Sequence, residues 1–169
     1  MKIIEGMKQI KDLQRKAEDL RTKIAKCSAD LDFETQQYPD QEQRVSGWLQ
    51  AHSDILKEIL DLRVRIQKTN IAVSVCIDLG GVVVTKTIAE WIHRRRDLAK
   101  MEQLAWAGLT DKGLKEGQVK QSDGTIRDVR LRRYYKPEER DEKISLYKSE
   151  PLLIDAKLEV VNATTELFF

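Results

Sequence analysis

The sequence is poor in the residues that interrupt helices or cross-link chains. Its 169 residues include three prolines, eight glycines and two cysteines, and aromatic residues make up only 6%. So few helix breakers leave little room for long loops, and a charged fraction of 34% suits helices with large solvated surfaces. Cys27 and Cys76 stand far apart and belong to no CxxC pair or Cys/His cluster, which argues against a disulfide framework or a zinc site. We therefore expect reduced thiols, no metal or other cofactor, and a cytoplasmic location.

Membrane and catalytic patterns are also missing. The N-terminal stretch MKIIEGMKQIKDLQRK is charged from its start, and the longest apolar-rich run, residues 71–84, is broken by Asp78 and two glycines. The chain has no HExxH, no nucleophile elbow and no GxGxxG. A net charge of +2 is too small to mark a nucleic-acid binder by itself. We expect a protein that is not an enzyme and has no membrane partner, which leaves binding or scaffolding.

Residues 1–70 predict a long antiparallel helical hairpin. The first segment carries an a/d seam over about four heptads. The seam consists of Ile3, Ile10, Leu13, Ala17, Leu20, Ile24, Cys27 and Leu31. A polar stretch ending at Pro39 is the predicted loop, and a second helix is expected over about residues 43–69. This helix has a surplus apolar stripe, formed by Leu49, Leu56 and Leu60, which we expect to pack against later helices, a second subunit, or both.

The remaining sequence predicts two β segments and two further helices. Residues 71–86 alternate with period two around Gly80-Gly81, as is typical of a β-hairpin. The other expected elements are a third helix over residues 87–113, a second β segment over 118–135 and a C-terminal helix over 137–165. Pro151 either kinks that last helix or divides it in two near residue 150. We expect the terminal Phe168 and Phe169 to be docked.

These elements give the predicted fold class. It is mainly α, with a long N-terminal antiparallel helical hairpin, two further helices and short β-hairpin segments. The whole chain, residues 1–169, is expected to form a single domain. Because the narrow seam and the surplus stripe need neighbours, we expect an oligomeric helical bundle.

Basic side chains form the clearest candidate site. Three lie on the third helix, namely Arg94, Arg95 and Arg96. The others lie in the second β segment beside two tyrosines, and they are Arg127, Arg130, Arg132, Arg133, Tyr134 and Tyr135, with only Asp128 opposing them. Guanidinium groups bind phosphates with two parallel hydrogen bonds, and an adjacent aromatic ring stacks on a base. The alternative is that these arginines solvate a β edge and pair with nearby glutamates.

Strand geometry limits how many of these side chains one ligand can contact. In an extended strand Arg130, Arg132 and Tyr134 share one face, whereas Arg127, Arg133 and Tyr135 share the other. One chain therefore cannot direct all of them to one site. Asn70 and Asn162 are further candidates at two predicted helix ends, where capping is the main expectation and ligand contact the alternative.

Three stretches stand in the same order as similar stretches in septicolysin-like proteins, a family of small helical bacterial proteins. They are RIQKTN at residues 65–70, RRDL at 95–98 after a threonine-led helix start, and NATTEL at 162–167. The chain resembles this family in layout over roughly residues 1–167. The resemblance implies two long N-terminal helices, a third helix, a short β segment and a closing helix, in a homo-oligomer with a hexamer as one expected form. The chain departs from the family in its longer β-like stretch at residues 73–84 and in Pro151.

The functional expectation combines self-assembly with the basic clusters. We expect a non-enzymatic homo-oligomer that binds, or sequesters, a small anionic or nucleotide-like ligand at its subunit interfaces. The alternatives are a purely structural or scaffolding oligomer without a small ligand, and a weak nucleic-acid-binding protein, which we rank below the first two.

Overall fold

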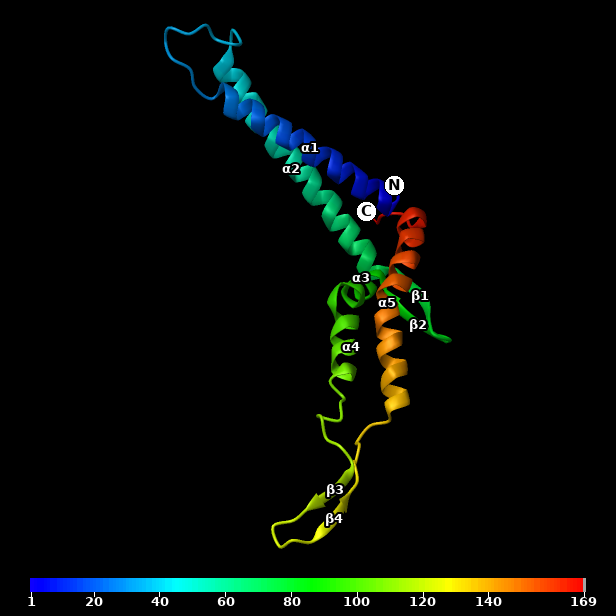
Figure 1. Ribbon diagram of the computed structural model, residues 1–169. Coiled ribbons are helices and arrows are strands. Elements are labelled where there is room, and N and C mark those ends of the chain that lie inside the picture. The colour runs from blue at the N-terminus through cyan, green and yellow to red at the C-terminus, as the bar shows by residue number, and fades with distance from the viewer. Residues whose placement is uncertain (169) are drawn as a thin grey trace. The chain divides into compact units, whose positions relative to one another are not determined.

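The structure is a computed structural model that describes residues 1–168, and these residues divide into two compact units (Figure 1). The hairpin unit comprises residues 1–74, 87–89 and the chain from residue 158 onward. The arm unit comprises residues 75–86 and 90–157. Helices predominate and two small antiparallel sheets accompany them, which confirms the prediction of a mainly α fold. The oligomeric bundle stays a prediction.

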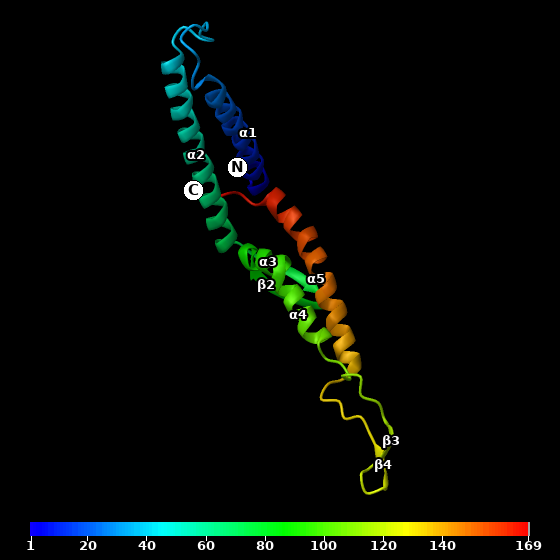
Figure 2. The ribbon, with the colours of Figure 1, turned by 60° about the vertical axis from the view of Figure 1, so that its left-hand side comes forward.

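In the hairpin unit, helices α1 (Ile3–Cys27) and α2 (Gln41–Ala72) lie side by side and antiparallel, as Figure 2 shows. Their contact is apolar, with Leu13 of α1 packed against Ile59 and Leu62 of α2, and Ile10 and Ile55 adding to the cluster. Each of these side chains belongs to the 3-4 spacing of its own helix, so burying the cluster holds the two helices together. The predicted helical hairpin is therefore confirmed.

The surplus apolar stripe of α2 is exposed. Leu49, Leu56 and Leu60 are 54%, 50% and 63% exposed, so no described residue covers them. Leu31, the last member of the predicted α1 seam, is also exposed, because α1 ends at Cys27 and Leu31 lies in the following loop. The stripe is thus a row of apolar side chains on α2 that residues 1–168 leave uncovered.

The C-terminal segment closes the hairpin unit by pairing with the start of α1. The backbone of Ile3 donates to the Thr165 carbonyl at 3.0 Å, and the Leu167 backbone donates to the Met1 carbonyl at 2.8 Å. The Leu167 side chain is buried, and a Cβ added at Gly6 would stand 2.8 Å from its Cδ1 atom. Gly6 is therefore the position where α1 leaves room for the terminal segment.

Phe168 is held by its backbone. Its N–H donates to Thr69 Oγ1 at 2.9 Å and its carbonyl accepts from Arg65 Nε at 3.1 Å, while its ring remains exposed. The expected docking of Phe168 thus occurs through the main chain and not through the ring. The same expectation for Phe169 lies outside the described residues.

Strands β1 (Ser74–Leu79) and β2 (Val82–Thr87) form the first two-stranded sheet, joined at Gly80 and Gly81. Both glycines have positive φ, 66° and 91°, which a two-residue turn of the I′ kind requires. The predicted hairpin is confirmed, but its start at residue 71 is wrong. Helix α2 continues to Ala72, because helical backbone hydrogen bonding carries past Asn70 and the Val73 N–H still donates to Thr69.

The predicted third helix, residues 87–113, is shorter and irregular. It consists of α3 (Ile88–His93), a π-helical turn η1 (Arg94–Leu98) and α4 (Ala99–Ala107). Its predicted end at Gly113 is wrong, since the chain leaves the helix at Gly108. The last helix, α5 (Pro137–Thr164), runs through Pro151 without ending, which excludes the division near residue 150. A proline removes only one backbone hydrogen bond, and the flanking turns of a helix of 28 residues retain theirs.

Strands β3 (Gly117–Lys120) and β4 (Ile126–Val129) pair antiparallel, with Val119 opposite Arg127. Every residue from 117 to 129 is exposed, and we call this part of the arm unit the arm. The predicted β segment 118–135 is too long, since β4 ends at Val129. Beyond it, the Leu131 N–H donates to a Glu116 carboxylate oxygen at 2.9 Å and not to a neighbouring strand. The alternation of faces inferred for residues 130–135 therefore does not hold.

Candidate anion-binding site

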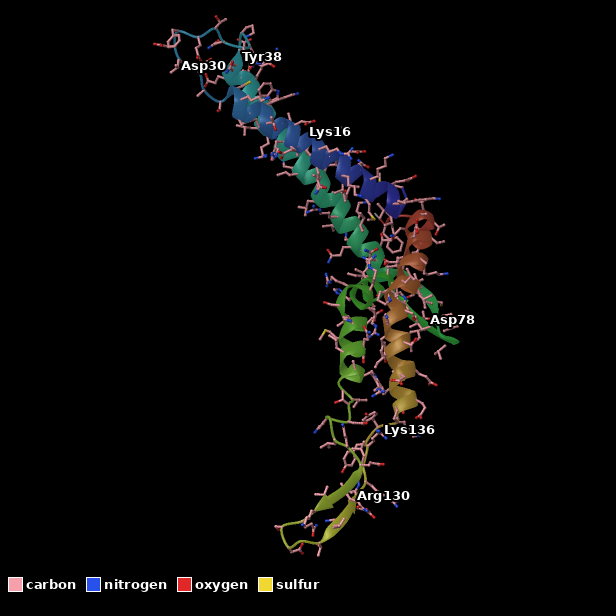
Figure 3. The ribbon with its side chains drawn as sticks, in the orientation of Figure 1. Lys16, Asp30, Tyr38, Asp78, Arg130 and Lys136 are labelled. Atoms are coloured by element: carbon pink, nitrogen blue, oxygen red, sulfur yellow. The ribbon has the colours of Figure 1, made fainter. Side chains whose placement is uncertain are left out.

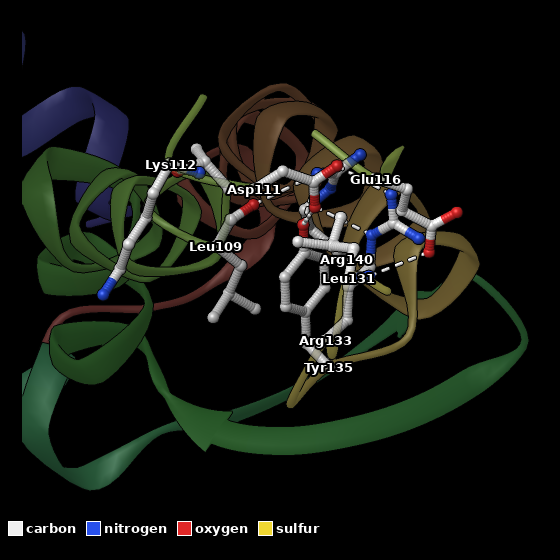
Figure 4. Close-up of polar contacts among 9 residues, drawn as sticks. Leu109, Asp111, Lys112, Glu116, Leu131, Arg133, Tyr135 and Arg140 are labelled. Atoms are coloured by element: carbon white, nitrogen blue, oxygen red, sulfur yellow. Dashed lines mark hydrogen bonds and ion pairs between the residues drawn. The ribbon is translucent and has the colours of Figure 1, made fainter. Parts of the chain in front are cut away.

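A cavity of about 280 Å³ lies in the arm unit between the loop that follows α4 and the loop that precedes α5. Figure 4 shows polar contacts among residues around it. Its walls are formed by Gly108, Leu109, Thr110, Asp111, Lys112, Leu114, Leu131, Arg132, Arg133, Tyr134 and Tyr135. Four of the sequence-predicted residues therefore come together here, and these are Arg132, Arg133, Tyr134 and Tyr135.

The first loop is shaped by a left-handed turn. Lys112 and Gly113 both have positive φ, 54° and 71°, and Lys112 is the one residue other than glycine with positive φ among the described residues. The turn is closed by a hydrogen bond of 2.9 Å from the Leu114 N–H to the Asp111 carbonyl. Such a conformation is costly for a side chain with a Cβ. The turn directs the chain so that Asp111 meets the second loop.

Asp111 binds the second loop through its carboxylate. Arg133 donates from Nε to Oδ1 and from Nη2 to Oδ2, both at 2.7 Å, and Tyr135 Oη donates to Oδ1 at 2.9 Å. The Arg133 guanidinium, and next to it the Tyr135 hydroxyl, lower the pKa of Asp111 to about 2. The same pairing raises the pKa of Arg133 above its ordinary value. The carboxylate is therefore ionised throughout the neutral range.

Helix α5 anchors both loops through Arg140. Its Nη1 donates to the Leu109 carbonyl at 3.1 Å, and its guanidinium stands 5.5 Å from the centre of the Tyr135 ring. Arg140 also pairs with Asp141 at 2.8 Å through Nε. A positive group over an aromatic face is attracted by the ring quadrupole, so Arg140 fixes the ring that bonds Asp111.

The cavity offers both an apolar surface and positive charge. Leu109, Leu114 and Leu131 contribute aliphatic side chains, and Tyr134 is 89% exposed. Lys112 and Arg132 also line it, and neither makes an ion pair within the chain from residue 1 to 168. The leucines and the exposed tyrosine ring could contact an apolar ring of a ligand, and the two unpaired cations could bind a negative group.

The three arginines of η1 are engaged elsewhere. Arg94 donates from Nε and Nη2 to the two carboxylate oxygens of Glu150, both at 2.7 Å, and this pairing raises its pKa. Arg95 pairs with Asp155 at 2.7 Å, and Arg96 contacts His93 Nδ1 at the same distance. Arg94 and Arg95 thus behave as the alternative interpretation expects, pairing with acids of α5. None of the three lines the cavity.

Arg127 and Arg130 lie outside the cavity, on the arm and directly after it, and both are exposed (Figure 3 labels Arg130). Asn70 and Asn162 belong to the hairpin unit. The expectation that Asn70 ends a helix is wrong, since it lies inside α2 with its Oδ1 atom buried and given no hydrogen bond by residues 1–168.

Asp111, Lys112 and Arg140 also belong to this site, although no pattern in the sequence predicts them. Asp111 lies 22 residues before Arg133 in a loop, and no periodic pattern relates the two. The only local signal was Lys112-Gly113, where a glycine favours a left-handed turn. Within residues 1–168 no three His, Cys, Asp or Glu side chains form a group that could hold a metal ion. None of the helices over the same residues is both long and apolar enough to cross a bilayer.

Comparison with known proteins gives a fold relationship. No family model matches the sequence, and no curated protein matches it either. The fold is similar to the crystal structure of a functionally unknown conserved protein from Corynebacterium diphtheriae, with a TM-score of 0.56. The two chains share 19% identity, and the match covers 99% of each. At this identity the likeness shows a common fold over nearly the whole chain.

Proposed function

We propose that this chain is a non-enzymatic homo-oligomer that binds, or sequesters, a small anionic, nucleotide-like ligand in the cavity between residues 108–114 and 131–135. The proposal rests on one observation. The same cavity is lined by three leucines, two tyrosines and three cationic side chains, which are Lys112, Arg132 and Arg133. We place this activity in the cytoplasm, since both cysteines are free thiols.

The size and chemistry of the cavity define the ligand. Its volume, about 280 Å³, lies just below the range of small-molecule sites, which runs from roughly 300 to 1,000 Å³. One aromatic ring with one charged group fits such a space, whereas a dinucleotide does not. The Arg133 guanidinium, which here binds Asp111, has a planar geometry that also suits a phosphate, and the exposed Tyr134 ring offers a stacking face.

Self-assembly is the second part of the proposal, and it is supported by the exposed stripe on α2. Leu49, Leu56 and Leu60 form a row that an isolated chain leaves in water. We propose that a second copy of the chain covers this row. If subunits also meet at the cavity, the second copy would add further walls to it. The resemblance to septicolysin-like proteins and the hexamer that it implies stay predictions.

The proposal is tested by thermal shift with a panel of nucleoside monophosphates, on wild type, Arg133→Ala and Arg127→Ala. A bound ligand raises the melting temperature of the folded state that it prefers. We expect the rise in wild type and Arg127→Ala, whose missing charge lies outside the cavity, and no rise in Arg133→Ala. Equal behaviour of all three proteins would show that the cavity binds no such ligand.

Weak nucleic-acid binding is a second candidate, favoured by the charges around the arm. Residues 111–136 contain eight lysines and arginines and four acids. Three of these acids accept internal hydrogen bonds, Asp111 from Arg133, Glu116 from Leu131 and Asp123 from Thr125. Apart from Arg133, which pairs with Asp111, none of these lysines and arginines forms an ion pair within residues 1–168. If they bind a polyanion, retention of single-stranded DNA will fall steeply with salt, and a flat salt response contradicts this candidate.

A further inference from the structure

The donors around Asp111 form an anion site that is already occupied from within the chain. Three hydrogen bonds converge on one carboxylate, two from the Arg133 fork and one from the Tyr135 hydroxyl. The same fork geometry recognises carboxylates and phosphates in ligands. All three residues line the cavity. Figure 4 shows their side chains close together, with dashed lines for the polar contacts. An anion entering from solvent therefore meets its best donors bound to Asp111.

The Asp111 carboxylate can leave these donors without any change of the fold. Its side chain has two rotatable bonds and is about a third exposed, at 36%. The loop itself is closed by hydrogen bonds that do not involve the carboxylate: the Leu114 N–H donates to the Asp111 carbonyl, and the Lys112 N–H donates to the Thr110 hydroxyl. Arg140 holds the Leu109 carbonyl independently. Rotation of one side chain would free the Arg133 fork while the turn stays in place.

We infer that Asp111 acts as an internal competitor that makes the cavity selective for phosphomonoesters over carboxylates. This inference rests on the proposed function and names its ligand class. A dissolved carboxylate that displaces Asp111 exchanges one carboxylate for an identical group, and the resident one is tethered at an effective concentration on the order of millimolar or more. A phosphomonoester carries about −1.5 to −2 charges at pH 7 and a third oxygen. It alone gains enough from Arg133, Tyr135 and the neighbouring Lys112 and Arg132 to displace the tethered group.

The test uses two probes with the same ring, phenyl phosphate and phenylacetate, titrated calorimetrically into the full chain. Wild type is expected to bind phenyl phosphate at least about tenfold more tightly than phenylacetate, because only the dianion displaces the tethered carboxylate. In Asp111→Asn the tethered group is neutral and can no longer form the two-oxygen pairing with Arg133, so phenylacetate affinity should rise about tenfold or more and the preference for phenyl phosphate should narrow. Asp128→Asn, which removes an equal charge from the arm, should behave as wild type.

The outcomes separate this inference from the proposed function. If wild type binds phenyl phosphate and Asp111→Asn keeps the same preference, the competitor role is wrong while the ligand site stands. If Asp128→Asn matches Asp111→Asn, general charge and not the fork explains the change, which also overturns the inference. If no protein binds either probe, both fail. Circular dichroism and melting curves check that each variant is folded. A second variant, Asp111→Ser, should show the same narrowed preference for phenyl phosphate over phenylacetate as Asp111→Asn.

Discussion

Arg94 and Glu150 join the π-helical turn η1 to helix α5 through an ion pair in which both guanidinium donors lie 2.7 Å from the carboxylate oxygens. Glu150 is 1% exposed, so its charge is removed from water and depends on this partner. Arg94 also lies 3.7 Å from Glu102 and 5.7 Å from the Tyr147 ring. A π-helical turn places one extra residue in the helix, and here it brings Arg94 onto a buried acid.

Removing Arg94 is predicted to be strongly destabilising. Arg94→Leu leaves the Glu150 carboxylate buried without its cation, a situation that typically costs about 3–5 kcal/mol of unfolding free energy. The double variant Arg94→Leu/Glu150→Leu removes both charges and is expected to recover most of the loss. Denaturant unfolding followed by circular dichroism measures both. A single variant as stable as wild type would show that the pair contributes nothing.

The docking of the C-terminal segment predicts different outcomes at two helical glycines. Gly47→Ala introduces a methyl group with no atom within 4 Å, so it should stabilise α2 by about 1 kcal/mol. Gly6→Ala places its methyl 2.8 Å from Leu167 Cδ1. Overpacking of that kind costs about 1–3 kcal/mol, so Gly6→Ala should be less stable than Gly47→Ala by about that amount. Equal gains in thermal unfolding would mean that Leu167 does not pack against Gly6.

The contacts of Asp111 predict the pH range over which its carboxylate binds Arg133 and Tyr135. Because the pKa of Asp111 in the folded chain is lowered to about 2, from an unfolded value near 3.9, its contribution to stability is fully present above about pH 5. That contribution is lost as the pH falls through about 2. The NMR chemical shifts of the Asp111 carboxyl carbon and of the neighbouring Tyr135 ring should stay constant from pH 8 to about 4. A midpoint at the unfolded value would contradict the observed hydrogen bonds.

The exposed stripe of α2 predicts the assembly state. Wild type should exceed 19.6 kDa in light scattering, and Leu56→Lys/Leu60→Glu should shift it toward the monomer, because charged groups oppose burial of that face. Leu104→Gln is the matched control, since Leu104 is also exposed but lies on α4. A wild-type mass equal to that of one chain would remove the reason for a second copy on this face.

Local periodicity explains which parts of the fold could be predicted. The seam that places Leu13 against Ile59 and Leu62 repeats within each helix, and Gly80-Gly81 marks a turn by backbone chemistry alone. The alternation at residues 71–73 wrongly predicts the start of a strand. These residues complete α2, because tertiary context overrides a short β pattern. Period-two patterns of only three residues carry little information against an extending helix.

Only part of the candidate site could be predicted from the sequence, because its residues come from two loops. Arg132, Arg133 and the two tyrosines stood out as a cluster, and the structure brings them to one cavity. Their acidic partner, Asp111, lies in a loop, and loop residues that meet across space share no period. The assumption of a continuous strand through residue 135 also concealed the pairing, because it directed Arg133 and Arg132 to opposite faces.

The most direct test of the account is a crystal structure of the protein with bromophenyl phosphate, located by the anomalous signal of bromine. We expect bromine among Leu109, Leu114 and Leu131, with the phosphate on Arg133 and the Asp111 carboxylate turned away from it. Bromine at another place, or a phosphate that leaves the Asp111–Arg133 pair intact, would contradict it.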